Sequence, residues 1–193
     1  KNRDILVLSD EVYEHLIFDG LMHQSVCRFP ELASRSLVVG SFGKTFHATG
    51  WKCGFVLAPP NLTSEFRKVH QFVVFAVNTP VQHALADFLK DPANYNNLGS
   101  FYQEKRDIFL KLVSGSRFKA IPASGTYFQL LDYSRISDEK ETAFAERLTR
   151  EHKIASVPVS PFYHNQKDNK VLRFCFAKTG ETLEKAAEIL CRI

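Results

Sequence analysis

Five side chains with acidic, basic or hydroxyl groups lie beside three short apolar runs in the first third of the sequence. Asp10 and Tyr13 stand in "SDEVY", after the apolar run "ILVL". Ser41 and Lys44 stand in "SFGKT", after "LVV", and Lys52 precedes "FVLA". A carboxylate, a phenol, a hydroxyl and two amines form a donor set for a small anionic ligand. Open α/β sheets bind such ligands just outside the carboxyl ends of their strands.

Each of these residues alone has an ordinary structural explanation. An Asp after a strand is most often a cap or turn residue, and a single Lys is usually a solvated surface charge. Arg173, inside the late apolar run "VLRFCF", could be an edge residue or half of an ion pair. The joint occurrence of the motifs at successive strand ends is what favours a functional site.

The elements that must position these side chains follow from the apolar pattern. Short continuous apolar runs are typical of buried strands in an α/β sheet that is covered on both faces. These runs lie at residues 5–8, 37–39 and 55–58. Helical patterns follow at residues 62–75, with Asn61 as the predicted N-cap, and at residues 79–91.

The character of the chain changes after the break at "DPANYNN". Alternating aromatic and apolar residues predict strands within residues 118–133, 154–160 and 170–177. Helical spacing appears at residues 98–113 and 141–152, and in a closing helix with Thr179 as its cap. We therefore divide the chain near residue 95. Residues 1–95 are the predicted C-terminal part of a large α/β domain, and residues 96–193 a smaller α+β domain.

Composition excludes several classes of protein. The 193 residues are 45% hydrophobic and 24% charged, which predicts a packed core. A net charge of +4 without a long basic run argues against a nucleic-acid partner. We find neither the ~20 consecutive apolar residues of a membrane helix nor a Cys/His pattern typical of a metal site. Four scattered cysteines favour reduced thiols and a cytoplasmic location.

The start of the sequence favours a piece of a longer protein. It begins "KNRDILVLSDEVY", without an initiator Met and a few residues before a strongly apolar strand. A parallel strand of this kind needs neighbouring strands and crossover helices before it. We therefore expect that an N-terminal part is missing, with a processed chain or a truncated chain as weaker alternatives.

The long motifs resemble those of a known enzyme family. "SDEVYEHLIFDG" and "SFGKTFHATGWKCGF" resemble two signature segments of the class I/II aminotransferases, pyridoxal-phosphate enzymes of fold type I. "VLRFCFAKTGETLEKAAEIL" resembles their C-terminal arginine segment. "GKTFHATGWK" and "RKVHQF" are most similar to the kynurenine/glutamine transaminase and methionine aminotransferase branch. The resemblance runs in order over essentially the whole chain, whereas composition alone supports only an α/β protein with an anionic ligand.

The resemblance implies roles for the residues at the strand ends. Lys44 would bond to the cofactor aldehyde and carry the proton between the substrate Cα and the cofactor. Asp10 would keep the pyridine nitrogen protonated, and Tyr13 would hydrogen-bond the phenolic oxygen of the cofactor. Ser41 and Lys52 would hold the phosphate. Many aminotransferases have Arg at the position of Lys52, but Lys is usual in the branch named above.

The resemblance also implies the substrate contacts and the assembly. Arg173 would clamp the α-carboxylate of the substrate in a bidentate fork. Phe75 would reach the substrate pocket of a neighbouring subunit in a homodimer, and core packing at the helix end is the alternative. An apolar residue there favours methionine, aromatic or other neutral amino acids. The predicted reaction is amino transfer between such an amino acid and a 2-oxo acid.

Two other functions stay open. The same lysine and cofactor could catalyse C–S β-elimination on cysteine conjugates, and pyruvate with ammonia as products would distinguish it. An aminotransferase-like ligand-sensing domain of a transcription regulator is a different class, and an upstream helix-turn-helix would identify it. The family's remaining cofactor contacts lie upstream of this sequence. For that reason the isolated chain is expected to bind pyridoxal phosphate weakly or not at all.

Overall fold

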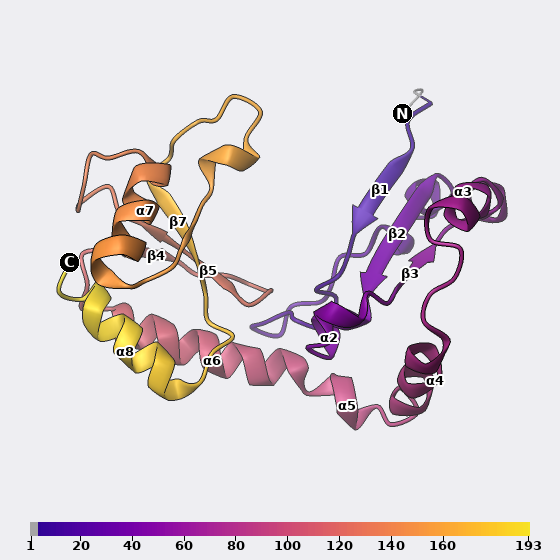
Figure 1. Cartoon of the computed structure of the whole chain (residues 1–193), viewed down its shortest axis with the longest axis horizontal. Coiled ribbons are helices and arrows are strands. Elements are labelled where there is room, and N and C mark those ends of the chain that lie inside the picture. The colour runs from indigo at the N-terminus through magenta and orange to yellow at the C-terminus, as the bar shows by residue number, and fades with distance from the viewer. Residues whose placement is uncertain (1–3) are drawn as a thin grey trace. The chain divides into compact units, whose positions relative to one another are not determined.

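The computed structural model describes residues 4–193, and the chain divides into two compact units, residues 1–98 and 99–193 (Figure 1). The boundary expected near residue 95 falls within the short helix α5 (Ala93–Asn96), just before this division. Each unit has its own sheet. Along residues 4–193, no helix combines the length and the apolar character needed to span a bilayer.

The N-terminal unit contains a three-stranded sheet in the order β1-β2-β3. Its strands are β1 (Val7–Asp10), β2 (Ser36–Ser41) and β3 (Gly54–Leu57). β1 runs parallel to β2, with Asp10 opposite Val39, whereas β3 runs antiparallel to β2, with Ser41 opposite Gly54. The carboxyl ends of β1 and β2 and the amino end of β3 therefore lie at one edge of the sheet.

The predicted strands are present, but the first begins later than expected. Pairing starts where Val7 meets Ser36, so Ile5 and Leu6 precede the ladder. The prediction that the strands are buried on both faces is wrong for the outer strands β1 and β3. In the described part of the chain, Leu8 of β1 is 74% exposed and Leu57 of β3 is 54% exposed. Among the described residues, the faces that carry these two side chains are therefore not fully covered.

Helices and short turns complete the N-terminal unit. The 3₁₀ turns are η1 (Val26–Arg28) and η2 (Thr49–Trp51). The helices before α5 are α1 (Pro30–Ala33), α2 (Phe42–Thr45), α3 (Pro60–Val73) and α4 (Thr79–Phe88). The prediction of Asn61 as N-cap is wrong, because Pro60 already occupies the first turn of α3 and Pro59 takes the cap position. Leu16 and Phe18 are fully buried.

The C-terminal unit contains an antiparallel sheet in the order β4-β5-β7-β6. Its strands are β4 (Lys119–Ile121), β5 (Phe128–Asp132), β6 (Val157–Pro158) and β7 (Val171–Cys175). Its helices are α6 (Leu98–Val113), α7 (Glu141–His152), the 3₁₀ turn η3 (Ser160–Phe162) and α8 (Gly180–Leu190). α6 and α8 run side by side (Figure 1), and Cys191 Sγ at the end of α8 contacts the Leu112 carbonyl. The predicted strands and the Thr179 cap are confirmed.

A buried carboxylate organises the loop between β6 and β7. Glu141, at the start of α7, has no exposed surface. Its Oε1 accepts hydrogen bonds from the backbone N–H groups of Asn169 (3.0 Å) and Val171 (3.2 Å). Its Oε2 accepts from Val159 (2.9 Å) and from Ser160. Four amides from both ends of one loop therefore converge on a single side chain.

Candidate active site

The carboxylate and phenol of the "SDEVY" motif emerge at the edge of the sheet where β1 ends. Asp10 is the last residue of β1, and its exposed side chain accepts a hydrogen bond from Val12 N–H at 3.3 Å. Tyr13 lies in the turn that follows, which closes through Glu14 N–H to the Glu11 carbonyl at 3.1 Å. Both predicted residues therefore lie at or just beyond the carboxyl end of β1.

The neighbouring strand supplies a hydroxyl and an amine to the same edge. Ser41 ends β2 and begins the one-turn helix α2, which carries Lys44. Thr45 Oγ1 donates to the Ser41 carbonyl at 3.2 Å and so ties this turn to the strand end. Lys44 thus follows the strand end, as predicted, and lies on a helical turn. Such a turn fixes the direction of the side chain better than an irregular segment does.

Close backbone packing supports this turn, and it explains two of the glycines. A Cβ on Gly43 would lie 2.9 Å from Thr49 Cα. A Cβ on Gly54 would lie 2.5 Å from the Gly40 carbonyl oxygen. Neither position has room for a side chain, so the segments before and after Lys44 pack at backbone distance.

Lys52 reaches the same edge from the other side. It stands two positions before Gly54, the first residue of β3, which pairs with Ser41. Its backbone is left-handed (φ 53°, ψ 44°), and the residue is exposed. A left-handed non-glycine residue costs about 1–2 kcal/mol, and such strain is concentrated at functional sites. Asp10, Ser41 and the start of β3 therefore lie at the same end of the sheet, and Tyr13, Lys44 and Lys52 stand in the turns next to these positions.

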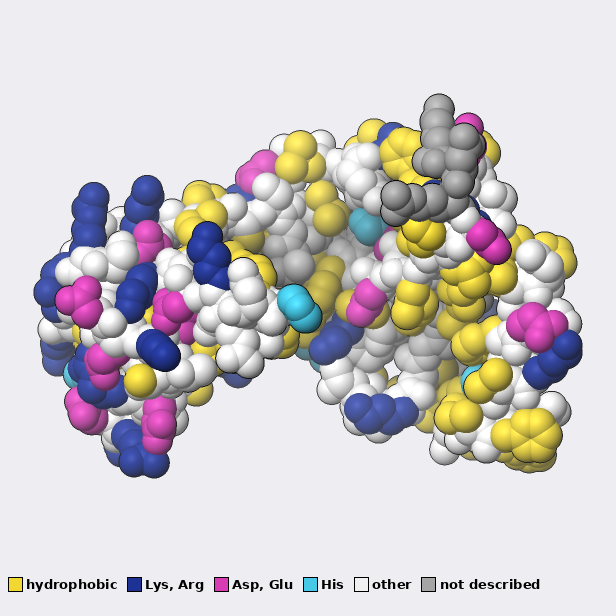
Figure 2. All heavy atoms as spheres, turned by 90° about the horizontal axis from the view of Figure 1, so that it is seen from above, with side chains coloured by type: hydrophobic (Ala, Val, Ile, Leu, Met, Phe, Trp, Pro, Cys, Tyr) yellow, Lys and Arg dark blue, Asp and Glu magenta, His cyan; other side chains and the backbone are white. Residues whose placement is uncertain are grey.

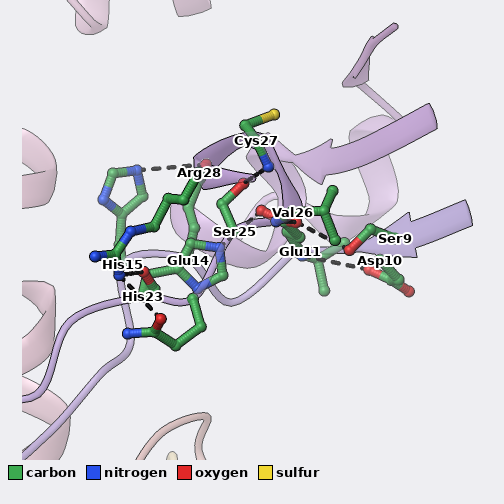
Figure 3. A network of polar contacts seen from close by, with 12 residues as sticks. Ser9, Asp10, Glu11, Glu14, His15, His23, Ser25, Val26, Cys27 and Arg28 are labelled. Atoms are coloured by element: carbon green, nitrogen blue, oxygen red, sulfur yellow. Dashed lines mark hydrogen bonds and ion pairs between the residues drawn. The ribbon is translucent and has the colours of Figure 1, made fainter. Parts of the chain in front are cut away.

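Sequence reasoning missed Glu11, the acid at this edge whose pKa is shifted most strongly. Its carboxylate is 8% exposed and is bound by Ser9 Oγ (2.9 Å), Val26 N–H (3.0 Å) and His23 Nε2 (2.8 Å) (Figure 3). Burial alone would raise the pKa of Glu11, but hydrogen bonds from His23, Ser25, Val26 and Ser9 outweigh burial and lower the pKa to about 2. His23 lies twelve positions after Glu11, a separation that matches no helical or strand periodicity, so no sequence pattern predicts this pair.

The two predicted substrate contacts have separate surroundings. Arg173 belongs to β7 of the C-terminal unit, and its guanidinium lies over the rings of Phe128 (4.3 Å) and Phe162 (5.5 Å). Its Nε is buried without a hydrogen-bond partner among the described residues. Phe75, just after α3, is 85% exposed and has a φ of 66°. The alternative that Phe75 packs in the core at the helix end is therefore wrong.

The donor set at the sheet edge fits pyridoxal phosphate chemically. The Lys44 amine could bond to an aldehyde, and the Asp10 carboxylate could hold a protonated ring nitrogen. The Lys52 amine and the Ser41 hydroxyl could hold a phosphate by charge and by hydrogen bond. Tyr13 could donate to a phenolic oxygen. We find no cluster of metal-binding side chains in residues 4–193.

Comparisons with known proteins agree with this chemistry. The family model for aminotransferase class I and II matches residues 1–190. Methionine aminotransferase of Escherichia coli (strain K12) is 47% identical over 97% of this chain and 49% of its own length. Human kynurenine–oxoglutarate transaminase 3 is 35% identical over 97% of this chain and 46% of its own length.

Among solved structures, that of YbdL from Escherichia coli, described as having a methionine aminotransferase function, superposes with a TM-score of 0.95 at 46% identity. The match covers 100% of this chain and 51% of YbdL. The chain thus spans about half the length of the relatives it matches. Given the family match, the site-bearing sheet edge and the fold-type-I architecture, the chain belongs to the class I and II aminotransferases.

Proposed function

We propose that the protein containing this chain is a pyridoxal-phosphate-dependent aminotransferase. It would move an amino group between a neutral amino acid and a 2-oxo acid. The observation that carries the proposal is the shared sheet edge, where β1 and β2 end and β3 begins. This edge gathers an amine, a carboxylate and anion-binding groups, the set that amino transfer requires. The names of the relatives, methionine and kynurenine aminotransferases, support the same reaction class.

Pyridoxal phosphate, when bound, supplies an aldehyde carbon and an electron-withdrawing ring. Lys44 Nζ would bond to that aldehyde until the substrate amine displaces it, and the freed amine would then move the proton from the substrate Cα to the cofactor carbon. Asp10 would hold the proton on the ring nitrogen, and Tyr13 would donate a hydrogen bond to the phenolic oxygen. Ser41 and Lys52 would keep the phosphate in place.

The proposed substrate contacts follow from the remaining two residues. Arg173 would bind the substrate α-carboxylate, and its unpaired Nε supports this role because a buried guanidinium donor needs an acceptor. The rings of Phe128 and Phe162 would keep the guanidinium plane in one orientation. Phe75 would contact the substrate side chain and favour methionine or aromatic substrates. Neither Phe75 nor Ala76 adds a basic group for a second carboxylate.

We further propose that the whole protein is a homodimer. Support comes from an apolar surface formed by the end of α3 and the residues after it, where Val69, Phe72, Val73 and Phe75 are 63–86% exposed. Figure 2 shows hydrophobic side chains gathered over the N-terminal unit, at the right of the view. Apolar patches of this kind mark interfaces. Sedimentation of the full-length protein tests the assembly. The cytoplasmic location stays a prediction.

The test compares full-length wild type with Lys44→Ala and with Lys185→Ala, a matched change at an exposed position in α8. Lys44→Ala should abolish the visible absorbance of bound cofactor and lower methionine:2-oxo-acid transfer at least about 10²–10⁴-fold, the usual contribution of a general acid–base group. Lys185→Ala should change neither. Retained transfer in Lys44→Ala would overturn the proposal. So would the release of pyruvate and ammonia, in place of a new amino acid, when the wild type is given a cysteine conjugate.

A second variant tests the substrate contact separately. Arg173→Ala should raise the KM for the amino acid and leave the cofactor absorbance intact, because the residue is assigned to the substrate alone. Loss of the absorbance in Arg173→Ala would contradict that role while leaving the assignment of Lys44 standing.

A further inference from the structure

Every polar group of Glu11 is bound, although the proposed mechanism gives this residue no task. Its N–H donates to the Val39 carbonyl at 2.9 Å and so extends the β1–β2 ladder by one residue. Its carbonyl accepts from Glu14 N–H, which closes the turn containing Tyr13. Its carboxylate binds His23 and Val26 at the far end of the next segment. Glu11 thus joins a strand, a turn and a distant loop.

Packing alone does not explain why the buried side chain at position 11 is a carboxylate. Burying a charge costs several kcal/mol unless hydrogen bonds satisfy it, and an apolar side chain of similar volume often stabilises as well or better. Here the bonds come from Ser9, His23 and Val26 (Figure 3), with a further contribution from Ser25, and they keep the group ionised at neutral pH. Unlike apolar contacts, directional hydrogen bonds fix the orientation of the Glu11 side chain.

That orientation is transmitted to two proposed cofactor contacts. Successive side chains of an extended strand point to opposite faces, so anchoring Glu11 on one face directs Asp10 toward the other. Tyr13 lies within the turn that Glu14 N–H closes on the Glu11 carbonyl, and the Tyr13 carbonyl accepts from Leu16 N–H at 2.9 Å. A shift of the Glu11 anchor would therefore move both contacts together.

We propose that Glu11, held by His23 and the Val26 amide, is a positioning residue that fixes Asp10 and Tyr13 for the cofactor. This proposal rests on the proposed function. It predicts that loss of the Glu11–His23 contact changes the state of bound pyridoxal phosphate rather than stability alone. Misplacing a catalytic group by about 1 Å costs on the order of 10²-fold in rate, so loss of the anchor should lower kcat about 10- to 100-fold.

The experiment uses full-length protein with Glu11→Gln, which keeps the side-chain volume. Glu14→Gln, in the same turn and with its carboxylate 3.6 Å from His15, is the matched control. Three quantities are measured: the dissociation constant of pyridoxal phosphate for the apoprotein, the pH midpoint of the bound-cofactor absorbance, and hydrogen exchange at the Val26 amide. Glu11→Gln should weaken cofactor binding about 10-fold or more and move the midpoint. The Val26 amide should exchange faster where the Gln NH₂ group replaces Oε1, whereas the His23 contact changes where it replaces Oε2. Glu14→Gln should change none of them.

His23→Gln keeps the test decisive if Glu11→Gln does not fold, because it removes one partner and leaves the bonds to Ser9 and Val26. His23→Gln should move the pH midpoint of the bound-cofactor absorbance in the same direction as Glu11→Gln does, but by a smaller amount. A lower melting temperature with unchanged midpoint and cofactor affinity, in either variant, would overturn the positioning role. Absence of cofactor binding in the wild type would instead refute the proposed function, so the two failures are distinguishable.

Discussion

Replacing Glu141 by Gln should destabilise the C-terminal unit strongly, although the two side chains are nearly equal in volume. The Glu141 carboxylate accepts two backbone N–H groups on each oxygen. Gln retains one oxygen and places an NH₂ group at the other position. Two of the four amides would then face a donor instead of an acceptor.

The magnitude follows from those two amides. A buried donor without an acceptor costs about 1–3 kcal/mol, so two cost about 2–6 kcal/mol. Removing the buried negative charge offsets part of this cost. We expect a net loss of about 2–4 kcal/mol, a large share of the roughly 5–15 kcal/mol that stabilises a typical domain.

Hydrogen exchange of the C-terminal unit, together with urea unfolding, measures this loss. Either the pair Val159 and Ser160 or the pair Asn169 and Val171 should exchange faster, depending on which oxygen Gln retains. Glu184→Gln, at an exposed position of α8, is the matched control and should change stability by less than about 0.5 kcal/mol. If Glu141→Gln matched the control and all four amides stayed protected, the assigned role of the carboxylate would be refuted.

Three further outcomes are expected from local contacts. Gly54→Ala should lower the free energy of unfolding by about 1–3 kcal/mol, because its Cβ would lie 2.5 Å from the Gly40 carbonyl oxygen. Gly50→Ala is the control, because no atom lies within 4 Å of the Cβ it would add. Thermal unfolding of the two variants measures the difference. The pKa of Glu11, lowered from 4.5 to about 2, gives up to about 3 kcal/mol of stability above pH 4.5 that is lost as the pH falls toward 2. Glu11→Gln should not show this loss of stability as the pH falls, and acid unfolding of the variant and the wild type measures the difference. Equal acid sensitivity of the two proteins would contradict the lowered pKa of Glu11. Burial raises the pKa of Tyr102 to about 12, so in an ultraviolet titration the difference from Tyr102→Phe should appear near pH 12, not near pH 10.

Local sequence signals predicted the elements and the strand-end residues well. Apolar runs located the strands, although the burial on both faces that such runs predict is wrong for β1 and β3. Thr179 was predicted as a cap and does accept the Thr182 N–H at 3.4 Å, since capping depends on residues three positions apart. Asn61 was predicted by the same rule and is wrong, because the preceding prolines fix φ and start α3 earlier.

Features that depend on distant partners could not be predicted. Glu11 is bound by His23 and Val26, and no periodic pattern links an acid to groups 12 and 15 positions later. The four amides on Glu141 come from a loop that begins 18 positions away. The exposure of Leu8 depends on what packs on its face of the sheet, which the run "ILVL" does not encode.

The direction of β3 is the unpredicted feature with the largest effect on the site. Because β3 is antiparallel to β2, Gly54 pairs with Ser41, and the residues just before β3 meet the carboxyl end of β2. Had β3 run parallel, its amino end would lie at the opposite edge, about 13 Å away along a four-residue strand. Lys52 could not then share a ligand with Asp10. The segment between β2 and β3 therefore carries both amines, Lys44 and Lys52, at the end of the sheet where Asp10 ends β1. The antiparallel direction of β3 makes the proposed phosphate contact of Lys52 geometrically possible.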